Sequence, residues 1–396
     1  MTVLDRLDAA LQLPDEEQMI LDSVRSLAVE HIAPAAKEFD RLKQFPWDNV
    51  KRINALGLNA MFVPEEYGGF PLSYCCYLAC VREISKACAS TGIIWATNFH
   101  AMRPVIEFGN EEQKRRFLPR VAEGSLAALA ITEPGAGSDA TGMTTLFREE
   151  GDEIVVEGGK TFITNGDVAD FYLVFGKWHG LDDSRRSISA LVLEKSTPGL
   201  EILRLEDKLG IRASGTATLR FDKCRVARAN LIGEPGGGLA ILLASLNLSR
   251  PSVAAHALGI ARAAFEDAVA YLNDRRQSER RILEFQGIQF MVADLAAELV
   301  LTENWLWTVG RMIDEGATNF GVEASILKLR ASDLAMRVAT DAVQFLGGYG
   351  YCTDFRVERL MRDAKITQIW EGTNQIHRQF IGRSFIARNG ESGEHR

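Results

Sequence analysis

Residues 370 to 378 read Trp370-Glu371-Gly372-Thr373-Asn374-Gln375-Ile376-His377-Arg378, which places one carboxylate beside a glycine, directly before a helix with a polar face. The glutamate follows Ile369 and a tryptophan, so it is expected on a partly desolvated wall. Such a wall disfavours the charged carboxylate and raises its pKa toward the range that suits a general base. The stretch therefore nominates Glu371 as a catalytic residue.

The residues after the glutamate suit a ligand site and a helix start equally well. Gly372 permits close approach of a ligand, and Thr373 offers an N-cap oxygen to the helix that follows. Asn374 and Gln375 carry groups that hydrogen-bond a polar ring system or solvent. The alternative is a surface loop with a helix cap, and one short motif does not decide between the two.

Longer motifs occur in two other segments of the chain. The first is Ala130-Ile131-Thr132-Glu133-Pro134-Gly135-Ala136-Gly137-Ser138-Asp139, and the second runs from Gln344 through Gly347-Gly348-Tyr349-Gly350 to Arg359 and Asp363. Together with Glu371 to Ile376, they resemble the acyl-CoA dehydrogenase family and follow the family's order. The resemblance covers roughly residues 15 to 388.

This resemblance implies an α+β fold with an acyl-CoA dehydrogenase-like domain order. The domains expected are an N-terminal α-helical domain over residues 1–125, a middle antiparallel β domain over 126–235 and a C-terminal four-helix bundle over 236–396. The residue pattern agrees, because apolar positions recur at helical spacing before Gly124 and after Gly238. Short runs rich in Val, Ile, Phe and Thr lie between them.

Two helix starts are predicted from local signals. Asp15-Glu16-Glu17-Gln18 resembles a capping box. Pro251 suits the first turn of a long helix that the stretch Asn247-Leu248-Ser249-Arg250-Pro251 opens.

The composition is that of an ordinary soluble globular protein. The chain has 396 residues, enough for two or three domains, with 46% hydrophobic and 25% charged residues and a net charge of -8. Neither a disordered chain nor a polyanion-binding surface is indicated, so no nucleic acid partner is expected.

The cysteines and the N-terminus bear on location. No CxxC pair occurs, and the thiols are interpreted as reduced and buried in an intracellular protein, with no metal site. Neither a signal peptide nor an apolar stretch near the roughly 20 residues of a membrane span is found, so no membrane partner is expected. The sequence favours a bacterial cytoplasmic protein and is also compatible with a mature mitochondrial matrix form.

The stretch Gly135–Ala140 matches the dinucleotide-binding pattern GxGxxA after an apparent strand. That pattern holds a pyrophosphate only where a helix begins, and Thr141-Gly142-Met143-Thr144-Thr145 leads into more β sequence. A Rossmann fold is therefore rejected. A glycine-containing loop still presents backbone N–H groups to a phosphate or to flavin carbonyls.

The resemblance implies flavin adenine dinucleotide (FAD) as the cofactor. It places the following residues at FAD: Leu129, Ile131, Thr132, Gly137, Ser138, Phe162, Ile163, Thr164, Arg275, Gln277, Gln286, Gln344, Gly347, Gly348, Thr373 and Gln375. Phe162 stands where the family usually has a tryptophan, and stacking on the flavin is expected to survive. Arg275 belongs to a segment that resembles the one with which the family reaches a neighbouring subunit's cofactor, and this resemblance implies a homotetramer. The alternative is a solvated basic face. There Ser278-Glu279 replaces the family's Phe-Gly and removes an apolar contact.

The resemblance also implies the substrate contacts. It places the following residues at an acyl-CoA thioester: Ser138, Asn247, Arg250, Trp95, Trp370, Gly372 and Arg383. Some relatives carry their catalytic glutamate at the position of Ser249, and a serine cannot serve as that base. Trp95 is expected to fill the far end of the acyl pocket and to favour short, branched or cyclic acyl groups. The alternative is that Trp95 packs between helices and never meets substrate. No role is assigned to His100 or His377.

The reaction implied is α,β-dehydrogenation to the 2-enoyl thioester. Glu371 would remove the α-proton while the β-hydrogen passes as hydride to flavin N5, and an electron-transfer flavoprotein would take the electrons. The alternatives on the same fold are an acyl-CoA oxidase, a relative that eliminates a β-substituent, and a flavin-binding homologue without turnover.

Overall fold

The computed structural model describes residues 3–9 and 11–386. The helices before the sheet are α1 (Val3–Ala9), α2 (Asp15–Leu27), α3 (Ala33–Leu42), α4 (Trp47–Ala55), α5 (Tyr74–Ala87), α6 (Ala89–Phe108) and α7 (Glu111–Ala122). The strands of the main sheet are β1 (Ala127–Ala130), β2 (Leu146–Glu150), β3 (Glu153–Thr164), β4 (Phe171–Trp178), β5 (Ile188–Glu194), β6 (Leu200–Leu205), β7 (Thr216–Ala227) and β8 (Leu231–Ile232). The remaining elements are α8 (Gly238–Asp274), the hairpin of β9 (Arg276–Gln277) and β10 (Arg280–Arg281), α9 (Gln286–Asp314), α10 (Gly321–Leu346), α11 (Val357–Thr367) and α12 (Asn374–Ser384).

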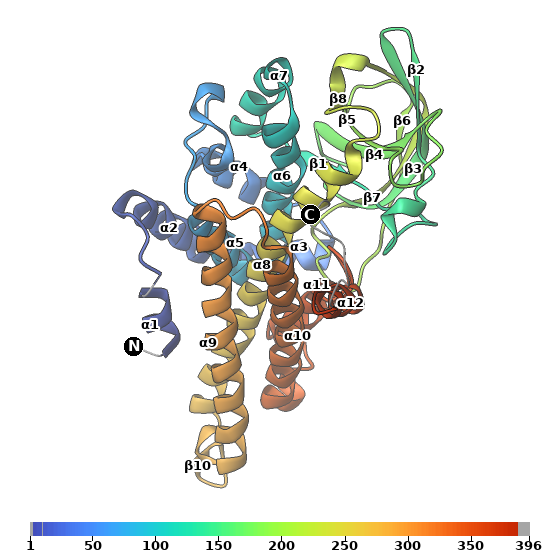
Figure 1. Ribbon diagram of the computed structural model, residues 1–396. Coiled ribbons are helices and arrows are strands. Elements are labelled where there is room, and N and C mark those ends of the chain that lie inside the picture. The colour runs from blue at the N-terminus through green and yellow to red at the C-terminus, as the bar shows by residue number, and fades with distance from the viewer. Residues whose placement is uncertain (1–2, 10, 387–396) are drawn as a thin grey trace.

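This order confirms the expected succession of helical, β and helical parts. The sheet lies at one end of the molecule, and α8, α9 and α10 run side by side away from it, down to the β9–β10 hairpin (Figure 1). Helix α8 is central, because it packs against α5, α6, α9, α10 and α11. Its length and composition alone would suffice to cross a membrane, but 61% of its most apolar window is buried against these neighbours.

Capping groups begin several helices, although not at the predicted place in α2. Helix α7 starts with a capping box in which Asn110 and Gln113 exchange side-chain and backbone hydrogen bonds. The predicted capping box at Asp15 is wrong, because the residue before α2 is Pro14 and no side chain caps that helix. Glu17 is instead buried and accepts a 2.7 Å hydrogen bond from the backbone N–H of Ser73, the N-cap residue of α5.

Pro251 does not open a helix, contrary to the prediction. It lies inside α8, which begins at Gly238 and continues to Asp274. A proline in a helix interior removes one backbone donor and crowds the preceding turn. Two side-chain hydroxyl groups contact carbonyl oxygens of that turn. The Tyr74 hydroxyl donates to the carbonyl of Leu248, and the Ser249 hydroxyl lies 3.2 Å from the carbonyl of Leu246. The helix stays continuous through this turn.

The main sheet has the strand order β6-β7-β3-β2-β4-β5-β8, with β1 also paired to β4. Most pairs are antiparallel, as expected for the middle domain, but β1 and β2 each pair with β4 in parallel. The β2–β3 hairpin lies between β1 and β4 along the chain, which allows β1 and β2 to run in the direction of β4.

The expectation of buried cysteines holds for all but one residue. Cys75, Cys76, Cys80, Cys88 and Cys224 are buried free thiols, whereas Cys352 is exposed in the segment that follows α10. The Gly135–Ala140 loop leads into a short turn at Ala140–Gly142 and then into β2, so it is no Rossmann motif.

Candidate active site

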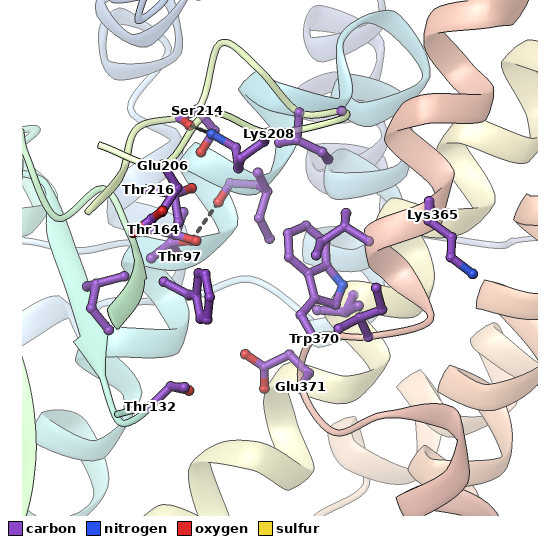
Figure 2. Close-up of a pocket in the computed structure, with 18 of the residues that line it drawn as sticks. Thr97, Thr132, Thr164, Glu206, Lys208, Ser214, Thr216, Lys365, Trp370 and Glu371 are labelled. Atoms are coloured by element: carbon purple, nitrogen blue, oxygen red, sulfur yellow. Dashed lines mark hydrogen bonds between the residues drawn. The ribbon is translucent and has the colours of Figure 1, made fainter. Parts of the chain in front are cut away.

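A cavity of about 640 Å³ lies between the sheet, α6, α8 and the loop that precedes α12. It collects residues that are far apart in the sequence (Figure 2). Its walls include Ile93, Thr97 and His100 of α6, Val253 of α8, residues 206–211 with Ser214 and Thr216, and residues 369–373.

Many predicted site residues meet on these walls. The cavity is lined by Leu129, Ile131, Thr132, Gly137, Ser138, Phe162, Ile163, Thr164, Trp370, Glu371, Gly372 and Thr373. The Glu371 side chain points toward the sheet side of the cavity, where Thr132 and Thr164 lie (Figure 2). A carboxylate and a set of hydroxyl groups therefore face one enclosed space.

Another group of predicted cofactor residues lies elsewhere in the chain. Arg275 and Gln277 are exposed at the end of α8 remote from the sheet, near β10 in Figure 1. The Arg275 guanidinium lies 5.9 Å from the ring of Tyr349, which follows Gly347 and Gly348. The remaining residues of this group, Gln286 and Gln344, are also exposed. None of these residues borders the cavity of its own chain.

The Ser278-Glu279 departure forms the tip of the β9–β10 hairpin. Both residues have positive φ angles, 50° and 60°, as a tight two-residue hairpin turn requires. Glycine adopts such angles without the clash that a Cβ atom causes, so the family's glycine would relieve strain at Glu279.

The backbone at the nominated base is unusual. Glu371 has a φ of 52° and Gly372 a φ of 93°, so the chain turns sharply just before Thr373 caps α12 through a 3.4 Å hydrogen bond from the N–H of Ile376. A positive φ at a non-glycine residue costs of order 1–3 kcal/mol and persists only where neighbours hold it. The carbonyls of both residues are held: His377 Nε2 lies 3.2 Å from the Glu371 oxygen, and Lys328 Nζ donates to the Gly372 oxygen at 2.7 Å.

The Glu371 carboxylate has one close hydrogen-bond donor. The hydroxyl of the buried residue Ser249 lies 2.6 Å from Oε2 of Glu371. Burial raises the pKa of Glu371, while this hydrogen bond and the positive charges of Arg250 and Lys328 oppose the rise. The result is a carboxylate whose pKa moves in the direction that suits a base near neutral pH.

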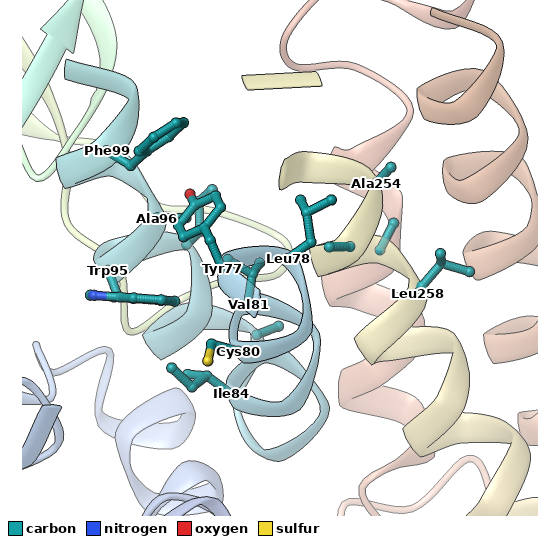
Figure 3. Close-up of a cluster of buried hydrophobic side chains, with 14 of the residues drawn as sticks. Tyr77, Leu78, Cys80, Val81, Ile84, Trp95, Ala96, Phe99, Ala254 and Leu258 are labelled. Carbon is teal, nitrogen blue, oxygen red and sulfur yellow. The ribbon is translucent and has the colours of Figure 1, made fainter. Parts of the chain in front are cut away.

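Trp95 does not border the cavity, although it was expected to fill the acyl pocket. It is 2% exposed, and its ring lies 5.5 Å from that of Tyr77 in a buried hydrophobic cluster (Figure 3). The helix explains the difference. Ile93, Thr97 and His100 follow helical spacing and share one face of α6, whereas Trp95 is about 200° around the axis from Ile93. The structure therefore favours the packing alternative for Trp95.

Asn374 is also differently placed from its expected role near a polar ring or solvent. It is buried, and its amide oxygen lies 3.0 Å from Lys328 Nζ while its amide nitrogen donates to Asp333 at 2.8 Å. Gln375 is exposed on α12, as is Arg383, and neither lines the cavity. Asn374 contacts both Lys328 and Ser332. These two polar residues stand four positions apart in the sequence, so they share one face of α10, and this spacing was the available sequence signal.

Comparison with known proteins agrees with this site. Family models described as the acyl-CoA dehydrogenase N-terminal, middle and C-terminal domains match residues 14–125, 128–224 and 236–386. An acyl-CoA dehydrogenase of Bacillus subtilis is 42% identical over 95% of this chain and 99% of its own length. The chain belongs to the acyl-CoA dehydrogenase family.

Further relatives of this chain are named for short acyl groups. The short-chain specific mitochondrial enzyme of Mus musculus is 40% identical over 94% of this chain and 90% of its own length. The structure of butyryl-CoA dehydrogenase from Megasphaera elsdenii has a TM-score of 0.92 at 37% identity and covers 94% of this chain and 98% of its own.

The residues present suit the FAD of an acyl-CoA dehydrogenase. Phe162 has a φ of 59° and is 63% exposed, so an aromatic side chain on the cavity wall is open to stacking. A Cβ atom built on Gly137 would meet nothing within 4 Å, which leaves room for close approach to the loop backbone. The buried Nε1 of Trp370 has no hydrogen-bond partner among the described residues.

A buried ion pair supports the loop that follows β1, which the resemblance assigns to the flavin and which is called the flavin loop below. Lys160 Nζ lies 2.7 Å from Glu133 Oε1 and also donates to the carbonyl of Ile131 at 2.9 Å. Glu133 in turn accepts hydrogen bonds from the N–H groups of Thr144 and Thr145. Burial opposes the charge on Glu133, yet Lys160 and these donors hold the pKa of Glu133 down to about 2. The pair therefore ties the loop to β3, and the sequence interpretation did not anticipate it.

Two residues expected at coenzyme A, Asn247 and Arg250, flank Ser249, the hydrogen-bond partner of Glu371. Arg250 is buried, and its guanidinium donates to Asn247 at 3.0 Å and lies 5.7 Å from the ring of Phe380. Its Nε has no partner among the described residues, which leaves one donor for a ligand. Neither Asn247 nor Arg250 borders the cavity itself.

Proposed function

We propose that this chain oxidises short acyl-CoA thioesters to 2-enoyl thioesters, with FAD as cofactor and Glu371 as the base. One observation carries the assignment of the base. The Glu371 carboxylate lies on a cavity wall opposite the flavin-loop residues, is desolvated, and is oriented by the Ser249 hydroxyl.

The reaction breaks two C–H bonds and forms one C=C bond. The α-proton passes to a carboxylate oxygen of Glu371, and the electron pair of the α-C–H bond becomes the new π bond. FAD, when bound, accepts the hydride that leaves the β-carbon. The raised pKa of Glu371 favours proton uptake, because a base works best with a pKa near the working pH.

The developing negative charge on the thioester oxygen needs a donor. The backbone N–H of Glu371 makes no hydrogen bond to any described residue. A preorganised N–H beside the base stabilises enolate character without reorganisation when the proton leaves. We assign this N–H to the thioester carbonyl, which would place the α-carbon beside the carboxylate.

The acyl preference rests on the walls of the cavity. Ile93 and Val253 supply apolar surface, and His100 is buried beside them with Nε2 unpartnered among the described residues. Burial lowers the pKa of His100 to about 3, so this ring is neutral at physiological pH. The short-chain and butyryl-CoA relatives support a small acyl group.

We also propose a homotetramer that passes its electrons to an electron-transfer flavoprotein. Arg275 and Gln277 do not border the cavity of their own chain, which supports contact with the FAD of a neighbouring subunit. Light scattering of the flavin-loaded protein tests the assembly, and an active monomer would refute it. Relatives come from bacteria and from mitochondria, and both locations are consistent with a soluble protein.

The decisive experiment is an anaerobic titration of the purified protein with butyryl, isobutyryl, hexanoyl and octanoyl thioesters. Bleaching of the flavin band by the short thioesters supports the proposal. Fast re-oxidation by air identifies an oxidase instead, and a colourless protein or a flavin that never bleaches contradicts the dehydrogenase assignment. Glu371→Gln should keep the flavin and lose roughly 10²–10⁴-fold in reduction rate, because the amide is similar in shape and cannot take a proton.

A further inference from the structure

Lys328 is a fully buried lysine in the first half of α10. Its Nζ donates to the carbonyl of Gly372 at 2.7 Å and to the amide oxygen of Asn374 at 3.0 Å. These acceptors lie one and three residues after Glu371. Lys328 does not line the cavity, so it does not touch a substrate or cofactor placed there.

We propose that Lys328 is a positioning residue that holds the Glu371 loop in its left-handed conformation. The proposal rests on the proposed function of Glu371. It assigns to Lys328 a role in the rate of proton removal and none in substrate binding.

The geometric part follows from the backbone of the loop. Glu371 and Gly372 both have positive φ angles, and the first of these needs outside support. His377 and Lys328 supply it by occupying consecutive carbonyl oxygens. Burial lowers the pKa of His377 to about 3, so its ring is neutral and the charge on this clamp comes from Lys328.

The environment of Lys328 involves charges from several elements. Burial lowers its pKa to about 7, the charges of Glu371 and Asp333 oppose that change, and Arg250 of α8 adds to it. The neutral imidazole of His377, on α12, also interacts with Lys328. The lysine charge in turn acts to lower the pKa of Glu371. Removing that charge should therefore raise the pKa of the base.

The test compares Lys328→Met, which loses both the donor and the charge, with Lys328→Gln, which keeps a donor and loses the charge. Arg330→Met is the matched control, because Arg330 is an exposed cation on the same helix that pairs with Glu298 at 3.6 Å. We expect the plateau rate of flavin reduction to fall roughly 10²-fold in Lys328→Met, as for a misplaced catalytic group, and less in Lys328→Gln. KM should change little in either variant.

The pH profile separates positioning from general stabilisation. In both Lys328 variants the acidic limb of kcat/KM should move to higher pH, whereas Arg330→Met should leave it in place. If Lys328→Met does not fold, the profile of Lys328→Gln decides the question. An unchanged limb together with a plateau rate within twofold of the unmodified protein would overturn the proposal.

A measurement that needs no turnover keeps this inference distinct from the proposed function. Hydrogen exchange followed by mass spectrometry should show faster exchange at residues 371–376 in Lys328→Met than in Arg330→Met. Equal exchange in the two variants would contradict the positioning role. If none of the thioesters reduces the flavin of the unmodified protein, the proposed function fails. The exchange data still test whether Lys328 holds the Glu371 loop.

Discussion

The Ser249 hydroxyl and the Glu371 carboxylate form a 2.6 Å hydrogen bond between α8 and the loop before α12. Ser249 is buried, so the bond lies where a charge-assisted hydrogen bond is strong. The bond fixes the position of Oε2 of Glu371 and leaves Oε1 to accept a proton. The bond also favours the charged form of Glu371 against the effect of burial.

The first prediction concerns the variant Ser249→Ala. Loss of the donor should raise the pKa of Glu371 further, so the acidic limb of kcat/KM should move to higher pH. The plateau rate should fall by roughly 10- to 150-fold, because a hydrogen bond to a charged group is worth about 1.5–3 kcal/mol. Stopped-flow flavin reduction between pH 5 and 9 provides the measurement. Ser249→Thr, which keeps the hydroxyl, is the control, and a limb that moves equally in both variants would contradict the role of the hydroxyl.

The second prediction concerns stacking by Phe162. Phe162→Ala should weaken FAD binding by roughly two- to tenfold, since an aromatic pair contributes about 0.5–1.5 kcal/mol beyond its buried area. Phe162→Trp should bind FAD at least as tightly as the unmodified protein. Fluorescence titration of apoprotein with FAD gives both affinities. Equal affinities for the alanine and tryptophan variants would show that this side chain does not stack on the cofactor.

The third prediction concerns acyl-chain length. Ile93 lines the cavity and Trp95 does not, so Ile93→Ala should admit longer chains. Each methylene newly buried should raise kcat/KM by about fourfold, from a transfer free energy of about 0.8 kcal/mol. Comparison of butyryl, hexanoyl and octanoyl thioesters measures the change.

Trp95→Phe is the control for this series. Its Nε1 has no hydrogen-bond partner among the described residues, so the change removes an unsatisfied donor and should leave the chain-length ranking as it was. A shift toward octanoyl in Trp95→Phe, with none in Ile93→Ala, would show that the tunnel runs past Trp95.

The fourth prediction concerns stability in acid. Burial lowers the pKa of His256 to about 4 and that of His377 to about 3, both below the ordinary value near 6.5. As pH falls below about 6.5, these histidines bind protons in the unfolded chain but stay neutral in the folded chain, so the free energy of unfolding decreases. The loss continues until pH reaches the folded pKa values. Each such histidine contributes up to about 1.4 kcal/mol per pH unit.

Chemical unfolding followed by circular dichroism from pH 4.5 to 7.5 measures this slope. His256→Gln removes one titrating group and keeps an amide that can donate to the carbonyl of Ala89, the present partner of Nε2. The slope should decrease in that variant and stay unchanged in the exposed variant His179→Gln. Equal slopes for His256→Gln and the unmodified protein would contradict the assignment.

Local sequence determined the order of the elements, because period and turn chemistry are encoded within a few residues. The helical and β parts and the rejection of a Rossmann fold followed from such patterns, as did the Thr373 cap. The motifs also selected residues that the fold brings to one cavity, among them Thr132, Phe162 and Glu371. Local signals failed where a distant partner intervened: Pro251 stays inside α8, and Glu17 holds the start of α5 instead of capping α2.

Only the tertiary structure decided which side chains meet. The face of α6 that carries Ile93 borders the cavity, and Trp95 on another face packs against Tyr77. Ser249 reaches Glu371 across 122 positions of sequence, and Lys328 reaches Gly372 across 44. Contacts at such separations depend on how α8, α10 and α12 pack. A sequence pattern specifies the apolar face of each helix, but it does not state which polar group on a neighbouring helix will lie within 3 Å.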